Sequence, residues 1–132
     1  MKKIMVLLAV VLILAGCGEK EYFKQIYLED VKGYMEEDKD GFMLIVTDNG
    51  ESFQSYVEDV AESEEVDIDM YNVYQSKEGA EDERPVLPYD EIKRFSELYY
   101  IEDNKVQGAL RVKDYEDMKL TEEVKHFVNL YE

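Results

Sequence analysis

The sequence predicts a mixed α/β domain in which helices flank a central four-stranded mixed sheet. Three observations indicate this fold class. Apolar residues recur at helical spacing in several segments, short β-forming runs lie between those segments, and a hairpin pattern precedes the last helix. The expected order of elements is α-β-α-β-α-β-β-α, with a right-handed β-α-β unit in the middle.

The N-terminus has the features of an export signal. Lys2 and Lys3 form a positively charged start, and residues 4–16 form an apolar run of 13 residues that leads into Cys17, so that residues 14–17 read "LAGC". The run is shorter than the ~20 residues of a bilayer-spanning helix. Its ending resembles the bacterial lipobox, in which a signal peptidase cuts before the cysteine and a diacylglycerol is attached to the sulfur. The alternative is an ordinary secretory signal with an incidental cysteine.

Lipidation at Cys17 divides the chain into three parts. Residues 1–16 are then a signal peptide, residues 17–21 a lipidated tether, and residues 22–132 a single domain. The resemblance implies anchoring to the cell membrane, on the extracytoplasmic face of the cytoplasmic membrane, by acyl chains such as palmitate. Cys17 is the only cysteine, so disulfides, cysteine nucleophiles and cysteinyl metal sites are excluded from the domain.

The chain is strongly acidic, with a formal net charge of −17. Such a surface repels nucleic acid and anionic lipid head groups, so neither is expected as a partner. The densest acidic stretch is "ESEEVDID", residues 62–69. It is either a solvated face that keeps a tethered protein soluble or an attraction for a basic partner or divalent cations. No EF-hand spacing occurs, and we expect no bound metal or other cofactor.

The first half of the domain contains two helical patterns and two strand patterns. The stretch "EYFKQIYLEDVKGYMEED", residues 21–38, has apolar residues at spacings of three and four and predicts an amphipathic helix. "FMLIVT", residues 42–47, predicts a central strand buried on both faces. "ESFQSYVEDVAES", residues 51–63, predicts a second helix, and "VDIDMYNVY", residues 66–74, a second strand.

The second half begins with a loop over residues 75–88, which contains Gly79, both prolines and many charges, followed by a short helix in "YDEIKRF". "ELYYIEDNKVQGALRV", residues 97–112, predicts a hairpin with its turn at Asp103-Asn104, where positive φ is tolerated. Thr121 is the expected N-cap of the last helix.

Two stretches carry a resemblance to a known family. In "YLEDVKGYMEEDKDGFMLIVTDNGESF" a helix and an apolar strand run into the start of the second helix, where the family has a Cys-x-x-Cys. "ELYYIEDNKV" is similar to a later stretch in which a cis-proline precedes an apolar strand. With the closing helix, the chain resembles small thioredoxin-like proteins of the bacteriocin-transport accessory type over about residues 22–131. The resemblance implies a thioredoxin-like fold.

The residues of the family's redox site are replaced in this chain. The two cysteines fall on Asn49 and Ser52, and the cis-proline falls on Ser96. Dithiol exchange needs an attacking thiolate and a resolving thiol, so we expect no redox enzyme and no catalytic residues. Asn49 or Ser52 is instead expected to cap the second helix, although glutathione-binding relatives hold a thiolate with a serine here. The only histidine, His126, is expected at the surface, away from this position.

Tyrosine is unusually frequent, with eleven tyrosines and no tryptophan. The candidate partner-binding residues are Tyr71, Tyr74, Tyr89 and Tyr99, because tyrosine is enriched in interface hot spots. The loop over residues 75–88 is the candidate specificity element. The alternative is that these tyrosines pack the sheet and direct their hydroxyls to water.

Together these features predict a non-catalytic, redox-inactive, thioredoxin-like lipoprotein that binds a protein partner. Immunity, exclusion between mobile elements, and assistance to a transport or conjugation machine are all compatible settings. The alternative is a thiol- or peptide-binding accessory domain of an oxidative folding pathway.

Overall fold

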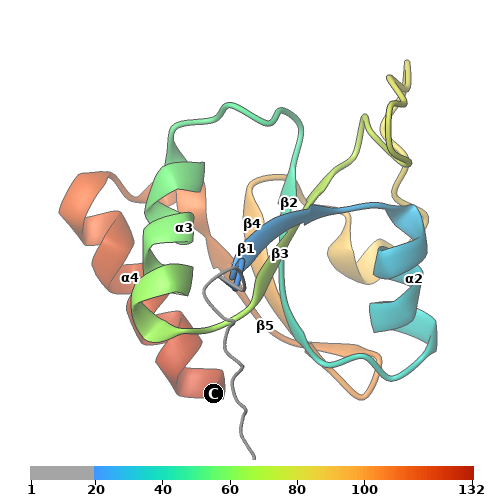
Figure 1. The fold of residues 1–132 in the computed structure, drawn as a ribbon. Coiled ribbons are helices and arrows are strands. Elements are labelled where there is room, and N and C mark those ends of the chain that lie inside the picture. Colours follow the sequence, from blue (N-terminus) through green and yellow to red (C-terminus); the bar gives the residue numbers. More distant parts are fainter. Residues whose placement is uncertain (1–19) are drawn as a thin grey trace, which may run out of the picture.

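Residues 20–132 are described by the structure, a computed structural model, so the expected signal peptide and Cys17 lie outside the described residues. The described chain folds into a five-stranded mixed sheet with helices on both faces (Figure 1). Its regular elements are β1 (Phe23–Ile26), α2 (Leu28–Glu36), β2 (Gly41–Val46), α3 (Phe53–Glu64), β3 (Ile68–Asn72), β4 (Glu97–Glu102), β5 (Lys105–Arg111) and α4 (Asp117–Tyr131). Two 3₁₀ turns, η2 (Asp90–Ile92) and η3 (Val112–Asp114), flank the hairpin. Within residues 20–132, no helix is both long and apolar enough to cross a membrane.

The strand order is β1-β3-β2-β4-β5. Strands β1, β3 and β2 run parallel, with Tyr71 of β3 paired to Ile26 on one side and Ile45 on the other. Strand β4 is antiparallel to β2, and β5 is antiparallel to β4. The carboxyl ends of β1, β2 and β3 therefore lie at the same end of the sheet as the start of β4 and the finish of β5. This end is called the carboxyl end of the sheet below, and the opposite one the amino end.

The segment Phe23–Ile26 is a strand, not the first turn of a helix as its apolar spacing predicts. Its pairing with β3 satisfies backbone N–H and C=O groups on both segments. A helical turn at residues 23–26 would leave those groups of β3 unpaired. The following residue, Tyr27, has extended backbone, and α2 begins only at Leu28. The sheet accordingly has five strands rather than the expected four.

Most other elements lie where the sequence predicts them. Strand β2 is buried on both faces, with every side chain from Phe42 to Val46 at most 4% exposed. Helix α3 and strand β3 fall within one to three residues of the expected ends. Asp103 and Asn104 have φ of 57° and 60°, the left-handed values that a two-residue hairpin turn requires. The short helix expected after the loop is the 3₁₀ turn η2.

The last helix begins earlier than expected. Helix α4 starts at Asp117 with Glu116 in the N-cap position, so Thr121 lies inside the helix and does not cap it. The earlier start places Leu120 on the buried face, where its side chain is 2% exposed. The hydroxyl of Tyr56 in α3 donates to Asp117 Oδ1 at 2.9 Å, which joins the two helix starts. Burial of Leu120 and this hydrogen bond explain why the helix begins before Thr121.

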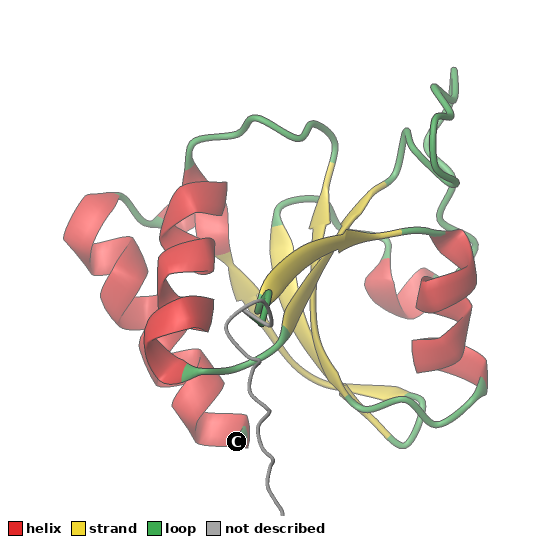
Figure 2. Ribbon diagram, in the orientation of Figure 1, coloured by secondary structure: helices red, strands yellow, loops and turns green. Residues whose placement is uncertain are grey.

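The core has two parts, one on each face of the sheet. Helices α3 and α4 cover one face, and α2 covers the other (Figure 2). Alternate residues of a strand point to opposite faces, so Phe42 and Leu44 belong to the first part while Met43 and Ile45 belong to the second. A helical layer on each face leaves the two ends of the sheet as the places where polar groups collect.

Candidate functional site

Four amide side chains meet at the carboxyl end of the sheet. Gln25 Nε2 donates to Gln75 Oε1 at 2.7 Å, and Asn49 Nδ2 donates to the same oxygen at 2.9 Å. Asn72 Nδ2 donates to Asn49 Oδ1 at 3.0 Å, while Asn72 Oδ1 accepts the backbone N–H of Tyr74 at 2.9 Å. Asn49 is thus bonded to side chains from β1, β3 and the following loop. It does not cap α3.

Ser52 occupies the N-cap position of α3 but does not cap it either. Its backbone is already helical, with φ −61° and ψ −32°, and its hydroxyl makes no capping hydrogen bond. The turn before the helix is held instead by Asp48, whose Oδ1 accepts the backbone N–H of Gly50 at 3.2 Å. The prediction that Asn49 or Ser52 caps α3 is therefore wrong. The Asn49 side chain is hydrogen-bonded within the amide cluster, and the helical backbone of Ser52 keeps its hydroxyl from accepting a backbone N–H of the first turn.

Ser96 also lies at the carboxyl end of the sheet. It is buried, at 3% exposure, and its φ of 61° is in the left-handed region that is uncommon for serine. Its backbone N–H donates to Ile45 O at 2.7 Å, and its carbonyl accepts the N–H of Val112 at 3.2 Å. These two bonds hold the segment before β4 between the ends of β2 and β5. Asn49, Ser52 and Ser96, which the resemblance would place at redox positions, thus lie at one end of the sheet.

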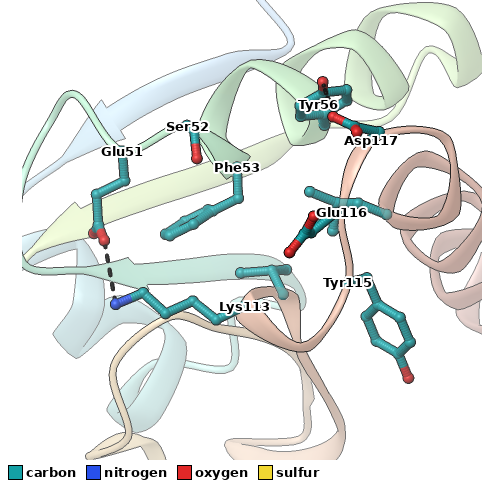
Figure 3. A pocket seen from close by; sticks show the side chains of 10 residues that line it. Glu51, Ser52, Phe53, Tyr56, Lys113, Tyr115, Glu116 and Asp117 are labelled. Atoms are coloured by element: carbon teal, nitrogen blue, oxygen red, sulfur yellow. Dashed lines mark hydrogen bonds and ion pairs between the residues drawn. The ribbon is translucent and has the colours of Figure 1, made fainter.

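A pocket of about 470 Å³ opens between the start of α3 and the start of α4 (Figure 3). We call it the α3–α4 pocket. Phe53, Val112 and Leu120 supply apolar surface, and carboxylates, Lys113, Ser52 and two tyrosines supply polar groups. The lining residues are Glu51, Ser52, Phe53, Tyr56, Val112, Lys113, Tyr115, Glu116, Asp117 and Leu120.

Glu51 is the most constrained carboxylate of the α3–α4 pocket. Its side chain is 18% exposed, and Oε1 lies 3.5 Å from Lys113 Nζ (Figure 3). Its other oxygen, Oε2, is buried and has no hydrogen-bond partner within residues 20–132. A carboxylate just before α3 is favoured by the helix dipole, which offsets part of the cost of its burial. His126 is exposed on α4 and does not line this pocket, as expected.

The expected specificity loop lies beside Asn49. Residues Thr47–Asn49 and Asn72 form one side of a second hollow, and Tyr74, Gln75 and Asp82 form the other. The loop is fixed to the sheet, because the N–H of Val86 donates to Val73 O and the N–H of Asp82 donates to Tyr74 O, both at 2.8 Å. The sequence identifies Asn49 and this loop separately, and the structure brings them together.

Two of the four candidate partner-binding tyrosines are core residues. Tyr71 is 0% exposed and Tyr99 is 3% exposed. The Tyr71 hydroxyl donates to Val86 O at 2.7 Å, and the Tyr99 hydroxyl contacts the backbone of Arg94 at 3.2 Å. Both strands are covered by helix or loop on the face that carries these side chains, so alternation along the strand does not expose them. The expected tyrosine surface is limited to Tyr74 and Tyr89, which are half-buried.

Cations gather at a site that the sequence did not single out. A hollow of about 370 Å³ at the carboxyl end of the sheet is lined by Lys93, Arg94, Phe95, Ser96, Arg111 and Lys113. We call these six residues the basic pocket. The cations come from two segments that are brought together only when β4 and β5 pair. To predict this pocket from the sequence, one would have to know that residues 93–95 ("KRF") and 111–113 ("RVK") lie side by side in the folded chain.

The fold and site define an α/β domain with polar pockets at the carboxyl end of its sheet and a further hollow at the amino end, beside Lys39 and Asp67. Residues 20–132 contain no group of three His, Cys, Asp or Glu side chains that could hold a metal ion. Comparison with known protein families, with curated proteins and with solved structures finds no match to this chain.

Proposed function

We propose that this chain is a non-catalytic, redox-inactive, thioredoxin-like lipoprotein that binds a protein partner on the outer face of the cytoplasmic membrane. The observation that carries the proposal is the position of Asn49, Ser52 and Ser96. All three lie at the carboxyl end of the sheet, where the resemblance would place a redox site, and none supplies sulfur.

The order of elements supports the thioredoxin-like part of the proposal. A parallel β-α-β unit formed by β2, α3 and β3 is followed by the antiparallel β4–β5 hairpin and by α4. This is the arrangement on which the resemblance rests. The strand β1, which the sequence did not predict, extends the parallel part of the sheet without interrupting that order.

The position of the N-terminal segment supports the presentation of this end to a partner. Lys20 Nζ lies 3.2 Å from Asp67 Oδ2, just before β3 begins, so the described chain starts at the amino end of the sheet. The loop over residues 75–88 lies at the opposite end (Figure 1). The residues that line the hollow beside Asn49 and the basic pocket also lie at that end. A lipid on Cys17 would therefore leave the carboxyl end facing away from the membrane.

Crosslinking in intact cells tests the proposal. A photoreactive residue is placed at Glu81 or Glu83, both exposed in the loop, and in matched proteins at Lys119 or His126, both exposed on α4. We expect one defined protein to be captured from the loop positions and not from α4. We also expect Cys17→Ala to release the protein from the membrane fraction.

Two outcomes would contradict this proposal. Equal capture from the loop and from α4 would remove the loop as the partner-binding element. Binding of glutathione to the purified protein, with loss of binding in Ser52→Ala, would instead favour the thiol-binding accessory domain, because Ser52 lines the α3–α4 pocket.

A further inference from the structure

The basic pocket is unusual in a chain of net charge −17. The chain has three arginines, and two of them, Arg94 and Arg111, line this one hollow together with Lys93 and Lys113. Its position is set by the fold, because Glu97 pairs with Arg111 where β4 begins and β5 ends. Carboxylates lie within 4 Å of three of these cations, so the four cations leave a small local excess of positive charge on an otherwise acidic molecule.

The cations of the basic pocket are only loosely held by the protein. Within residues 20–132, none of the four side chains donates a hydrogen bond to the chain, and Lys93 makes no ion pair. The ion pairs of the others are long, at 3.9 Å for Arg94 Nε to Glu97 Oε1, 3.8 Å for Arg111 Nε to Asp114 Oδ1 and 3.5 Å for Lys113 Nζ to Glu51 Oε1. Their donors remain free for a ligand, and guanidinium groups suit the two oxygens of a carboxylate.

An apolar contact lies next to the charges. Phe95 is 39% exposed, although most large apolar side chains of the described domain are buried. The backbone beside it is fixed, because Ser96 is held by hydrogen bonds to Ile45 and Val112. An exposed aromatic ring beside guanidinium groups suits a peptide, which supplies both apolar and charged side chains.

We infer that the basic pocket binds an acidic segment of the protein partner, with Lys93, Arg94, Arg111 and Lys113 contacting carboxylates and Phe95 contacting an apolar side chain. The inference rests on the proposed function, because it assigns a chemistry to the partner proposed there. Lys113 also lines the α3–α4 pocket, so the two pockets adjoin at this residue.

Anionic lipid is the other ligand that a basic pocket could attract. The pocket lies at the carboxyl end of the sheet, whereas Lys20, which belongs to the proposed lipidated tether, lies at the amino end. The proposed anchor thus places the pocket away from the membrane surface. The field of anionic lipid falls off within a Debye length of about 8 Å at physiological salt, so it does not reach the pocket.

The net charge of the chain limits how the acidic segment is recognised. Long-range attraction is absent, because the rest of the surface is acidic. At physiological salt, charges farther than about 8 Å are screened, so the cations of the pocket dominate at contact distance. The expected binding is local and specific to carboxylates, without fast electrostatic steering.

Peptide binding tests the inference. The lipidated full chain is placed in phosphatidylcholine vesicles at physiological salt and titrated into fluorescent hexaglutamate or hexaglutamine, with anisotropy as the readout. We expect saturable binding of hexaglutamate only. Lys93→Gln with Arg111→Gln should weaken it about tenfold or more, as expected when charge-assisted hydrogen bonds are lost. Arg94 is left in place because it pairs with the buried carboxylate of Glu97.

The matched control is Lys24→Gln with Lys105→Gln, which removes two exposed cations that do not line the basic pocket. This control should bind hexaglutamate like the original chain. Absence of hexaglutamate binding, or an equal loss in both double variants, would overturn the inference while leaving the crosslinked partner in place. If phosphatidylglycerol vesicles abolished peptide binding, the pocket would face the membrane, and the inference would also be wrong.

Discussion

Asp69 shows how single residues hold this fold together. Its side chain is 5% exposed, and Oδ2 accepts a hydrogen bond from the Tyr34 hydroxyl at 2.8 Å and from Lys39 Nζ at 3.2 Å. The Lys39 ammonium also lies 4.6 Å from the centre of the Tyr34 ring. Because a buried carboxylate is tolerated only when it is paired, these contacts fix α2 and the segment after it to β3.

Removal of the Tyr34 hydroxyl tests this role. In Tyr34→Phe, Asp69 keeps Lys39 but loses its shortest hydrogen bond, so we expect the free energy of unfolding in urea to fall by about 1–3 kcal/mol. Tyr89→Phe is the matched control, since the Tyr89 hydroxyl also bonds a carboxylate, that of Glu36, nearer the surface. Its effect should be clearly smaller. Equal losses in the two variants would mean that burial of Asp69 does not set the strength of the contact.

At the residue scale, the sequence specifies the chemical group at each position, but several contacts predicted from it are wrong. The absence of a thiol at Asn49 and Ser52 could be read directly from the sequence. That Asn49 bonds to Asn72 and Gln75 could not, because those residues follow it by more than twenty positions and meet it only when β2 and β3 pair. The burial of Tyr71 has the same cause, since a neighbouring loop covers it.

At the level of elements, the last turn of α4 packs against a glycine of the sheet. A Cβ atom on Gly108 of β5 would come within 2.6 Å of Tyr131 Cζ, so the tyrosine ring lies directly on the strand. The Tyr131 hydroxyl donates to Gln107 O at 3.0 Å, and its ring stacks on Tyr100 with centroids 4.8 Å apart. The Tyr131 side chain thus links the last turn of α4 to the β4–β5 hairpin.

Gly108→Ala should displace the Tyr131 ring. The colliding atoms are at the end of a side chain that can rotate away, so the expected cost is the lost stacking and hydrogen bond, about 1–2 kcal/mol of unfolding free energy. A double-mutant cycle measures this. In a Tyr131→Ala background, Gly108→Ala should cost almost nothing. A full additional loss in that background would place the strain in the strand itself.

Element types followed from periodicity wherever a segment was long enough to show it. Helix α3 and strand β2 are set by local pattern, and the hairpin turn is set by Asp103 and Asn104. The sequence pattern does not identify strand β1, because four residues are too few to distinguish the helical period of about 3.6 residues from the strand period of 2. Its identity depends on pairing with β3, more than forty residues away.

At the scale of the whole molecule, the fold separates the start of the described chain from the pockets at the carboxyl end of the sheet. Lys20 lies at the amino end, beside Asp67, whereas the basic pocket and the hollow beside Asn49 lie at the carboxyl end. Parallel strands joined through helices bring all their carboxyl ends together, so one end of the sheet receives the loops after β2 and β3. The sequence predicts the parallel unit, but the joining of the basic pocket from two segments depends on the finished sheet.

Three tyrosines with raised pKa values make the stability of the domain depend on pH in the alkaline range. Burial raises the pKa of Tyr71 to about 12, and burial followed by the hydrogen bond to Glu36 raises the pKa of Tyr89 to about 12. Burial and the charge of Asp69 raise the pKa of Tyr34 well above its ordinary value of 10.0. The folded state therefore holds these hydroxyls protonated at pH values where the unfolded chain releases them.

Stability should be insensitive to these tyrosines below pH 10 and should fall as the pH rises from 10 to about 12, because only the unfolded state loses protons there. Urea unfolding at a series of pH values, with tyrosinate absorbance followed in parallel, measures the fall. Self-repulsion of an acidic chain would also weaken the fold, but salt screens it. The tyrosine-linked fall should therefore persist in high salt. Its disappearance in salt, or titration of every tyrosine near pH 10 in the folded protein, would contradict this account.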